Sequence, residues 1–334
     1  MLRLPKFEYM APPTLDEAIS LLEFQRGGVK ILAGGTDLLP CLKDRLLTPA
    51  YVMDLRRVGG LTSIEKAPGN EIRIGALCSM TAIEESSLLK KRFAGLTDAA
   101  SLVGGPAIRN MGTIGGNIAI DTRCWYFNQS HLWRKSIEQC LKLGGAVCHV
   151  VKGAKRCHAC FVADTVPALI SLNADIIVRD SGGERRHLLK EIYTNDGKNP
   201  NKLKPHDIIT QICIPMPDGA SGSAYKKLML RGAIDFPLVS SAVYVCMDGD
   251  AIADVKIVLG AVDSGPIEIT EAENLLRGNT VNDDLIRKAG YMAQQAARPV
   301  ANRGSSPSYR KKMAGVFTRR ALKEAIARAK ANCV

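Results

Sequence analysis

The chain has 334 residues, of which 46% are hydrophobic and 5% aromatic, and its formal net charge is +12. This length allows two or three compact units with cores of their own. No stretch approaches the roughly 18 apolar residues of a membrane span, and the first residues lack the apolar core of a signal peptide. We therefore expect a cytoplasmic protein.

The basic residues are concentrated in parts of the chain. Residues 123–156 hold seven lysines and arginines against one acid, Glu138, and a second basic run covers residues 303–330. Nucleic acid is one explanation for this charge, but the sequence has no helix-turn-helix, zinc-finger or RNP-like pattern. An acidic protein partner, an anionic cofactor, a contact with another subunit or an ordinary solvated surface explains the charge as well.

The first third of the chain predicts a strand–helix–strand unit followed by a hairpin. Thr14 is expected to cap a helix after two prolines, and a capping box is expected at Thr81–Glu84. The predicted strands cover residues 29–33, 51–55, 61–66 and 71–77, and the later helix covers residues 95–103.

In the second half of the chain, the order of the predicted helices and strands changes after about residue 218. One more helix at 168–172 and a strand at 174–178 come first. Three antiparallel strands (225–230, 238–247, 251–262) and three helices (271–276, 283–297, 306–330) follow. Strands first and helices afterwards indicate a separate α+β unit.

Two glycine-rich segments follow or adjoin predicted strands, and both are candidates for binding a dinucleotide. The first is Gly34-Gly35-Thr36-Asp37, and the second runs from Arg109 to Asn117 through Gly112, Thr113, Gly115 and Gly116. Glycines let backbone N–H groups approach a pyrophosphate closely. A plain tight turn is the alternative for each. No G-x-G-x-x-G fingerprint or P-loop is present.

The cysteines form the most unusual pattern. Five of the ten (Cys124, Cys140, Cys148, Cys157, Cys160) lie within 37 residues, and a disulfide framework is not expected in a reducing cytoplasm. Four thiolates suit either structural zinc or an iron–sulfur cluster, and His149 and His158 are additional zinc ligands to consider. A flavin bound at the neighbouring glycine-rich segments would be a reason to have an electron carrier, which favours an iron–sulfur cluster over zinc. Unligated loop cysteines are the third possibility. The scattered Cys41, Cys78, Cys213, Cys246 and Cys333 are expected to be inert.

No catalytic dyad is recognisable. The five histidines are not paired with a nucleophile, and the sequence contains neither H-E-x-x-H nor G-x-S-x-G. The sequence therefore assigns no catalytic residue.

With these residues identified, the chain resembles the FAD-binding medium subunits of the xanthine dehydrogenase and carbon monoxide dehydrogenase family of molybdenum hydroxylases. The resemblance rests on segments 33–37, 112–117, 207–209, 214–215, 225–226 and 303–310, with Arg231. It implies an α+β fold, with a vanillyl-alcohol-oxidase-type FAD domain at 1–217 (subdomains 1–56 and 57–217) and an α+β domain at 218–334. The FAD contacts it implies are Ala33, Gly34, Gly35, Thr36, Asp37, Arg109, Gly112, Thr113, Gly115, Gly116, Asn117, Asp164, Ile209 and Lys226.

The chain departs from the ordinary family pattern by an insertion at about residues 122–161. This insertion resembles that of 4-hydroxybenzoyl-CoA reductase β subunits, which implies [4Fe–4S] ligands at Cys124, Cys140, Cys148 and Cys157, with Cys160 left over. The resemblance implies electron flow from ferredoxin through [4Fe–4S] and FAD to a small [2Fe–2S] subunit and a large molybdenum-cofactor subunit, in a dimer of heterotrimers that dehydroxylates 4-hydroxybenzoyl-CoA.

Two other functions remain open at this point. One is the FAD subunit of an oxidative molybdenum hydroxylase of the xanthine, aldehyde or CO dehydrogenase kind. The other is a zinc-stabilised interaction subunit without a redox role. The residues that would bind substrate are expected on another subunit in either enzyme, so the sequence does not discriminate between reduction and oxidation.

Overall fold

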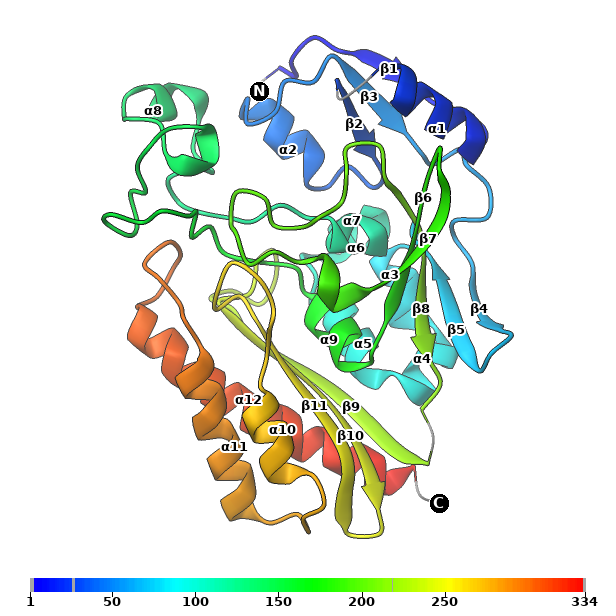
Figure 1. The fold of residues 1–334 in the computed structure, drawn as a ribbon, viewed down its shortest axis with the longest axis vertical. Coiled ribbons are helices and arrows are strands. Elements are labelled where there is room, and N and C mark those ends of the chain that lie inside the picture. Colours follow the sequence, from blue (N-terminus) through cyan, green and yellow to red (C-terminus); the bar gives the residue numbers. More distant parts are fainter. Residues whose placement is uncertain (1–2, 26–27, 218, 333–334) are drawn as a thin grey trace.

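A computed structural model describes residues 3–25, 28–217 and 219–332. Three sheets, each with its own helices, follow one another from the N-terminal to the C-terminal part of the molecule (Figure 1). The segment around the short helix α8 stands out at one side, at upper left in that view. The predicted boundary at residue 218 and the cysteine at position 333 lie outside the described residues.

The first sheet is parallel, with strand order β1-β3-β2. Thr14 caps α1 as predicted, since its side chain accepts a hydrogen bond from the Glu17 amide at 3.3 Å. The core of this lobe includes Ala18, Leu22 and Met53. Its elements are β1 (Glu8–Met10), α1 (Leu15–Phe24), β2 (Val29–Leu32), α2 (Leu38–Lys43) and β3 (Tyr51–Asp54).

The second sheet has five antiparallel strands in the order β4-β5-β8-β6-β7. The predicted hairpin forms β4 and β5. The chain leaves the sheet after β5, builds a layer of helices, and returns at β6. The strands are β4 (Ile64–Ala67), β5 (Glu71–Gly75), β6 (Asp175–Asp180), β7 (Gly183–Leu188) and β8 (Ile208–Pro215).

Several of the helices between β5 and β6 share a core with this sheet, whereas α8 stands apart from it. The cap of the first helix is Ser79 and not Thr81: the Ser79 hydroxyl accepts from the Ala82 amide, whereas the Thr81 hydroxyl contacts Asn110. The helices are α3 (Met80–Glu85), α4 (Ser87–Arg92), α5 (Ala94–Ser101), α6 (Pro106–Met111), α7 (Ile114–Ile118), α8 (His131–Lys135) and α9 (Thr165–Ser171).

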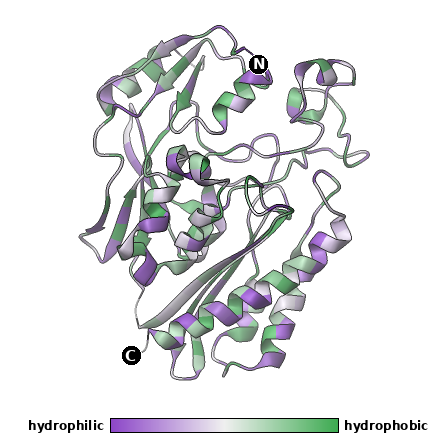
Figure 2. Cartoon of the chain, turned by 180° about the vertical axis from the view of Figure 1, so that it is seen from behind, coloured by the Kyte–Doolittle hydropathy of each residue, from purple (hydrophilic) through white to green (hydrophobic). Residues whose placement is uncertain are grey.

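The third sheet is antiparallel, in the order β12-β11-β10-β9, and three helices pack on one of its faces. Its other face meets α5 and α9 of the middle lobe. In Figure 2, α11 and α12 show alternating hydrophobic and hydrophilic bands, as expected for helices with one face on the sheet. The elements are β9 (Ala220–Leu228), β10 (Val239–Asp248), β11 (Ala251–Gly260), β12 (Ile267–Glu268), α10 (Thr270–Leu276), α11 (Asp283–Ala296) and α12 (Pro307–Ala331).

The cysteine-rich segment has little regular structure. Between α7 and α9 the described chain forms only α8 and a single 3-10 turn, Leu141–Leu143. Of the scattered cysteines, Cys41, Cys78 and Cys213 are buried and Cys246 is half-buried. No helix within the described ranges is both long enough and apolar enough to cross a bilayer.

Candidate functional site

The two glycine-rich segments lie against each other, although they are about 80 residues apart in the chain. A Cβ atom at Gly34 would lie 1.8 Å from the Met111 carbonyl oxygen, and a Cβ atom at Gly112 would lie 3.4 Å from the Thr36 hydroxyl. The backbones therefore meet only because side chains are absent. Thr36 and Gly116 are exposed at the surface of this joint loop.

The second glycine segment is held rigidly by its own side chains. The Thr113 hydroxyl caps α7 by accepting from the Gly116 amide at 3.2 Å. The Asn117 side-chain oxygen accepts from the amide and hydroxyl of Thr165 at 3.1 and 2.7 Å, which joins α7 to the start of α9. A Cβ atom at Gly115 would lie 2.9 Å from the Ala76 carbonyl oxygen. The loop thus keeps its shape through internal contacts, with Gly116 exposed to solvent.

Arg109 and Ile209 are set back from this surface. The Arg109 guanidinium donates to Glu84 of α3 at 2.8 Å, and its side chain is largely buried. Ile209 lies on β8 opposite Val178 and packs partly against the central core. The contact of Arg109 and Ile209 with FAD stays a prediction.

A buried charged group lies where the middle and C-terminal lobes meet. The Asp164 carboxylate accepts from the Tyr225 hydroxyl at 2.8 Å and from the Lys227 ammonium at 3.1 Å, and the Lys227 side chain is fully buried. Burial raises the pKa of Asp164, and the Lys227 charge opposes that shift. An opposite charge in contact is what allows a carboxylate to remain inside a protein.

The basic residue beside Asp164 is Lys227, whereas the sequence pointed to Lys226. Successive residues of a strand point to opposite faces of the sheet. Lys226 accordingly lies on the other face of β9, where it forms an ion pair with Glu324 of α12. The alternation along β9 was visible in the sequence, but which face meets the middle lobe was not.

Two arginines that sequence reasoning did not assign lie beside the first glycine segment. Arg123 forms an ion pair with Asp37, and its guanidinium lies 5.2 Å from the centre of the Phe236 ring. The guanidinium of Arg303 lies 5.7 Å from the same ring, and its Nη1 is buried without a partner. Burial, with Arg303 nearby, lowers the pKa of Arg123 to about 10. Two crowded guanidinium groups with one unpaired N–H favour an anionic ligand here.

The cysteine-rich segment brings four of its five thiols to one cavity. Cys124, Cys140, Cys148 and Cys157 all line it. Burial raises the pKa of Cys124, and neighbouring Cys140 and Cys148 raise it further. The four residues named by the resemblance are therefore together in space.

Cys160 is directed elsewhere. Its thiol lies 3.3 Å from the Ala261 carbonyl oxygen and 3.7 Å from a nitrogen of the buried Arg310, and it does not line the four-thiol cavity. The backbones of Cys160 and Arg123 form hydrogen bonds with each other. The Arg123 side chain extends from this bridge to Asp37.

Four thiols at one cavity suit either a structural zinc ion or an iron–sulfur cluster. Among the described residues, Asp180, His206 and Asp207 also place three potential ligand atoms within 4.8 Å of one another.

Two histidines of the segment, His149 and His158, also line this cavity. The His149 ring nitrogen Nε2 is 2.8 Å from the Glu138 carbonyl oxygen, and the ring lies 5.2 Å from that of Tyr126. Burial lowers the pKa of His158. The compact group at Asp180 is also occupied, because Arg185 bridges Asp180 and Asp207 at 2.5 and 2.7 Å.

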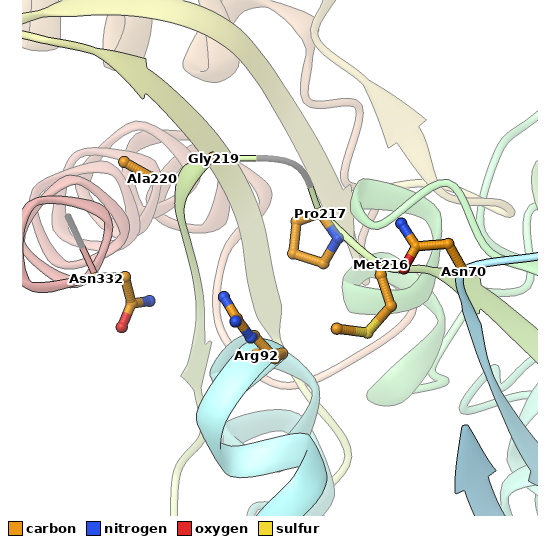
Figure 3. Close-up of a pocket in the computed structure, with 7 residues that line it drawn as sticks. All are labelled: Asn70, Arg92, Met216, Pro217, Gly219, Ala220 and Asn332. Carbon is orange, nitrogen blue, oxygen red and sulfur yellow. The ribbon is translucent and has the colours of Figure 1, made fainter. Parts of the chain in front are cut away.

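Another open pocket has no thiol in its lining. Asn70, Arg92, Met216 and Asn332 line it, together with the turn that leads into β9 (Figure 3). Arg92 is the one charged residue of its lining, and no cysteine or histidine reaches it. It offers no metal ligands.

Comparison with known proteins places these features in a family context. Residues 5–217 match the family model described as the FAD binding domain in molybdopterin dehydrogenase, and residues 223–325 match the CO dehydrogenase flavoprotein C-terminal domain. The chain is 30% identical over 321 residues to the glyceraldehyde dehydrogenase medium chain of Sulfolobus acidocaldarius, a match that covers 96% of this chain and 98% of that one.

Further matches point the same way. The chain is 29% identical to the carbon monoxide dehydrogenase medium chain of Afipia carboxidovorans, over 97% of this chain and 98% of that one. It also superposes on a solved chain of carbon monoxide dehydrogenase from Hydrogenophaga pseudoflava with a TM-score of 0.81 and 26% identity, covering 98% and 99% of the two chains. The expected fold, an FAD-binding domain followed by an antiparallel sheet with helices, is confirmed.

Proposed function

Because this chain belongs to the FAD-binding medium subunits of the molybdenum hydroxylase family, we propose that it is an electron-transfer subunit with two cofactors. FAD is expected at the joined glycine loops, and a [4Fe–4S] cluster in the insertion. The observation that carries the proposal is the convergence of four thiols on one cavity.

The residues around the glycine loops fit FAD. Gly34 and Gly112 allow two backbones to meet, and the exposed Gly116 leaves a surface without side chains for a pyrophosphate. Asp164, Ile209 and Lys226 are retained as proposed contacts, and Lys227 is added as the basic residue that pairs with Asp164. When bound, FAD supplies exchange between two-electron and one-electron carriers.

The residues around the thiol cavity fit an iron–sulfur cluster. Cys124, Cys140, Cys148 and Cys157 supply the four thiolates that such a cluster needs. Arg134 holds α8 against the first lobe by donating to the Asp44 and Arg45 carbonyl oxygens at 3.0 and 2.9 Å. This contact and the Arg123–Asp37 ion pair connect the cysteine-rich segment to the lobe that contains the first glycine-rich segment.

The insertion supports a specific enzyme type, 4-hydroxybenzoyl-CoA reductase. We propose partners with a molybdenum cofactor and with [2Fe–2S] centres, a dimer of heterotrimers, and a reduced ferredoxin as donor. The exposed lysines Lys135, Lys152 and Lys155 and the exposed Trp125 and Leu132 lie on the same segment as the thiols. Such a surface suits a weak, salt-sensitive encounter with an acidic redox protein.

A second candidate is favoured by the comparisons. The relatives named above are dehydrogenases of glyceraldehyde and carbon monoxide, and a further relative is an aldehyde oxidoreductase FAD-binding subunit of Escherichia coli. In this alternative the same two cofactors carry electrons outward from an oxidative molybdenum site, and the cluster serves as an additional relay.

An assay of the purified complex separates the two candidates. With reduced viologen and 4-hydroxybenzoyl-CoA, the main proposal expects dehydroxylation to benzoyl-CoA. Failure of that reaction, together with oxidation of an aldehyde or a purine by the same preparation, would instead support the oxidative enzyme. The cofactor proposal for this chain is tested separately by its iron and flavin content.

A further inference from the structure

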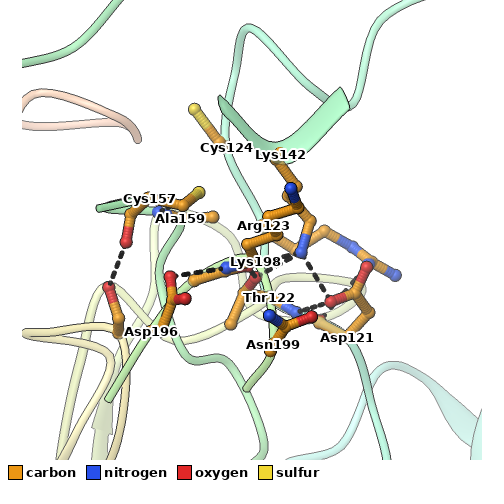
Figure 4. A network of polar contacts seen from close by, with 12 residues as sticks. Asp121, Thr122, Arg123, Cys124, Lys142, Cys157, Ala159, Asp196, Lys198 and Asn199 are labelled. Carbon is orange, nitrogen blue, oxygen red and sulfur yellow. Dashed lines mark hydrogen bonds and ion pairs between the residues drawn. The ribbon is translucent and has the colours of Figure 1, made fainter. Parts of the chain in front are cut away.

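Lys142 is a buried cation in the wall of the thiol cavity. It lies two residues after Cys140, its side chain is 4% exposed, and it lines the cavity with the four cysteines. Figure 4 shows its position beside Thr122 and Cys124. A lysine is seldom buried unless its ammonium is paired and hydrogen-bonded.

The Lys142 ammonium has all of its hydrogen bonds satisfied within the chain. It donates to the Asp121 carboxylate at 2.7 Å, to the Thr122 hydroxyl at 2.8 Å and to the Gly197 carbonyl oxygen at 2.5 Å. It also lies 5.0 Å from the centre of the Phe127 ring. Three N–H groups meet three acceptors, so the charge is fixed in place.

The charge balance around the cavity is uneven. Lys142 is the one lysine or arginine among the residues that line it, and that lining contains no aspartate or glutamate. Its counter-charge, Asp121, has a side chain that is 43% exposed, so solvent screens it more than the buried ammonium. Lys142 also opposes the effect of burial on the Cys157 thiol, whose pKa is raised to about 11.

We propose that Lys142 is a positioning residue that raises the reduction potential of the cluster held by the four thiols. The inference rests on the proposed function. Adding an electron makes a four-thiolate cluster more negative, and a fixed buried cation stabilises that reduced form more than the oxidised form. Lys142 thereby makes the cluster a better electron acceptor. Its contacts also fasten the 140–148 turn to residues 121 and 122, which lead directly to Arg123 and its ion pair with Asp37.

The test is a redox titration of the assembled complex, following the EPR signal of the reduced cluster. Lys142→Met should shift the midpoint potential to more negative values without loss of iron. Lys142→Arg should restore it toward the wild-type value. Lys152→Met is the matched control: it removes the same charge from an exposed position of the same segment, and it should leave the potential unchanged.

Asp121→Asn provides a test that does not depend on the stability of Lys142→Met. An asparagine still offers an oxygen to the ammonium but removes the counter-charge, so the potential should shift to more positive values, opposite to Lys142→Met. A structural role alone would not produce shifts of opposite sign. Unchanged potentials, or shifts in the same direction, would overturn the inference. Wild-type complex without a cluster at these thiols would instead overturn the proposed function on which it rests.

Discussion

The two candidate cofactor sites differ in the groups that form them, which are backbone in one and side chains in the other. The glycine site consists of backbone segments packed so closely that a Cβ at Gly34 would overlap the Met111 carbonyl. The thiol site consists of side chains from a long segment with one short helix and one 3-10 turn. The first keeps its shape through internal packing, and the second is held by a few polar anchors, such as Arg134 and Lys142.

Replacing Gly34 with alanine should have the largest effect. The added Cβ would lie 1.8 Å from a backbone oxygen that cannot move without displacing the second glycine loop. We expect loss of nearly all bound FAD, measured as the ratio of flavin to protein absorbance. Gly59→Ala is the control, because no atom lies within 4 Å of its added Cβ. Full flavin content in Gly34→Ala would show that the two loops need not touch.

Replacing Cys148 with serine should remove the iron of the insertion and its broad brown absorption while FAD remains. A hydroxyl does not replace a thiolate as a cluster ligand. Cys160→Ser should retain both, since Cys160 faces Arg310 and Ala261 and lies outside the cavity lining. Unchanged iron in Cys148→Ser, or iron loss in Cys160→Ser, would require a different ligand set.

Removing the metal should loosen one site and leave the other intact. After anaerobic chelation, we expect trypsin to cut within 134–156, where the backbone has few regular hydrogen bonds. The joined glycine loops should remain protected, because their contacts are internal. Equal cleavage rates before and after chelation would indicate that Arg134 and Lys142 hold the segment without metal.

Replacing Lys227 with methionine should destabilise the chain by about 3–5 kcal/mol, because it leaves Asp164 charged and buried without its partner. The neighbouring Lys226→Met is a matched control, since its ion pair with Glu324 is partly exposed and is worth about 1 kcal/mol or less. Chemical denaturation measures both. Similar losses for the two variants would contradict the assignment of Lys227 to the buried face of β9.

Asp54 gives the smallest predicted effect, in the lobe that carries the first glycine loop. Its hydrogen bonds with Arg56 and Tyr9 outweigh burial and lower its pKa to about 2. A lowered pKa stabilises the fold above about pH 4, and this stabilisation is lost as the pH falls toward 2. Because Arg56 is half-exposed, we expect about 1–2 kcal/mol. Asp54→Asn should abolish this pH dependence, as measured by denaturation at pH 5 and below.

The sequence predicted much of this architecture because many of its signals are local. Thr14 and the prolines before it mark the first helix, and the alternating strands from β9 onward mark the third sheet. The sequence did not predict the strand β7, because its residues are mostly charged and show no alternation of apolar and polar side chains. Arg186 on this strand forms ion pairs with Glu71 and Asp175.

The parts of the site that could not be predicted depend on long-range packing. The ion pair of Arg123 with Asp37 and the contacts of Arg123 and Arg303 with the Phe236 ring join residues from four distant segments. The choice between Lys226 and Lys227 depends on which face of β9 meets the middle lobe. The four cysteines could be named by resemblance, but their convergence on one cavity and the position of Lys142 in its wall depend on how the chain folds.

The most direct test of the central claim is metal analysis of the anaerobically purified complex together with EPR after reduction. We predict about four iron atoms and no stoichiometric zinc attributable to this chain, with the signal of a reduced [4Fe–4S] cluster beside one FAD. One zinc per chain and no such signal would contradict the proposal that this insertion carries electrons.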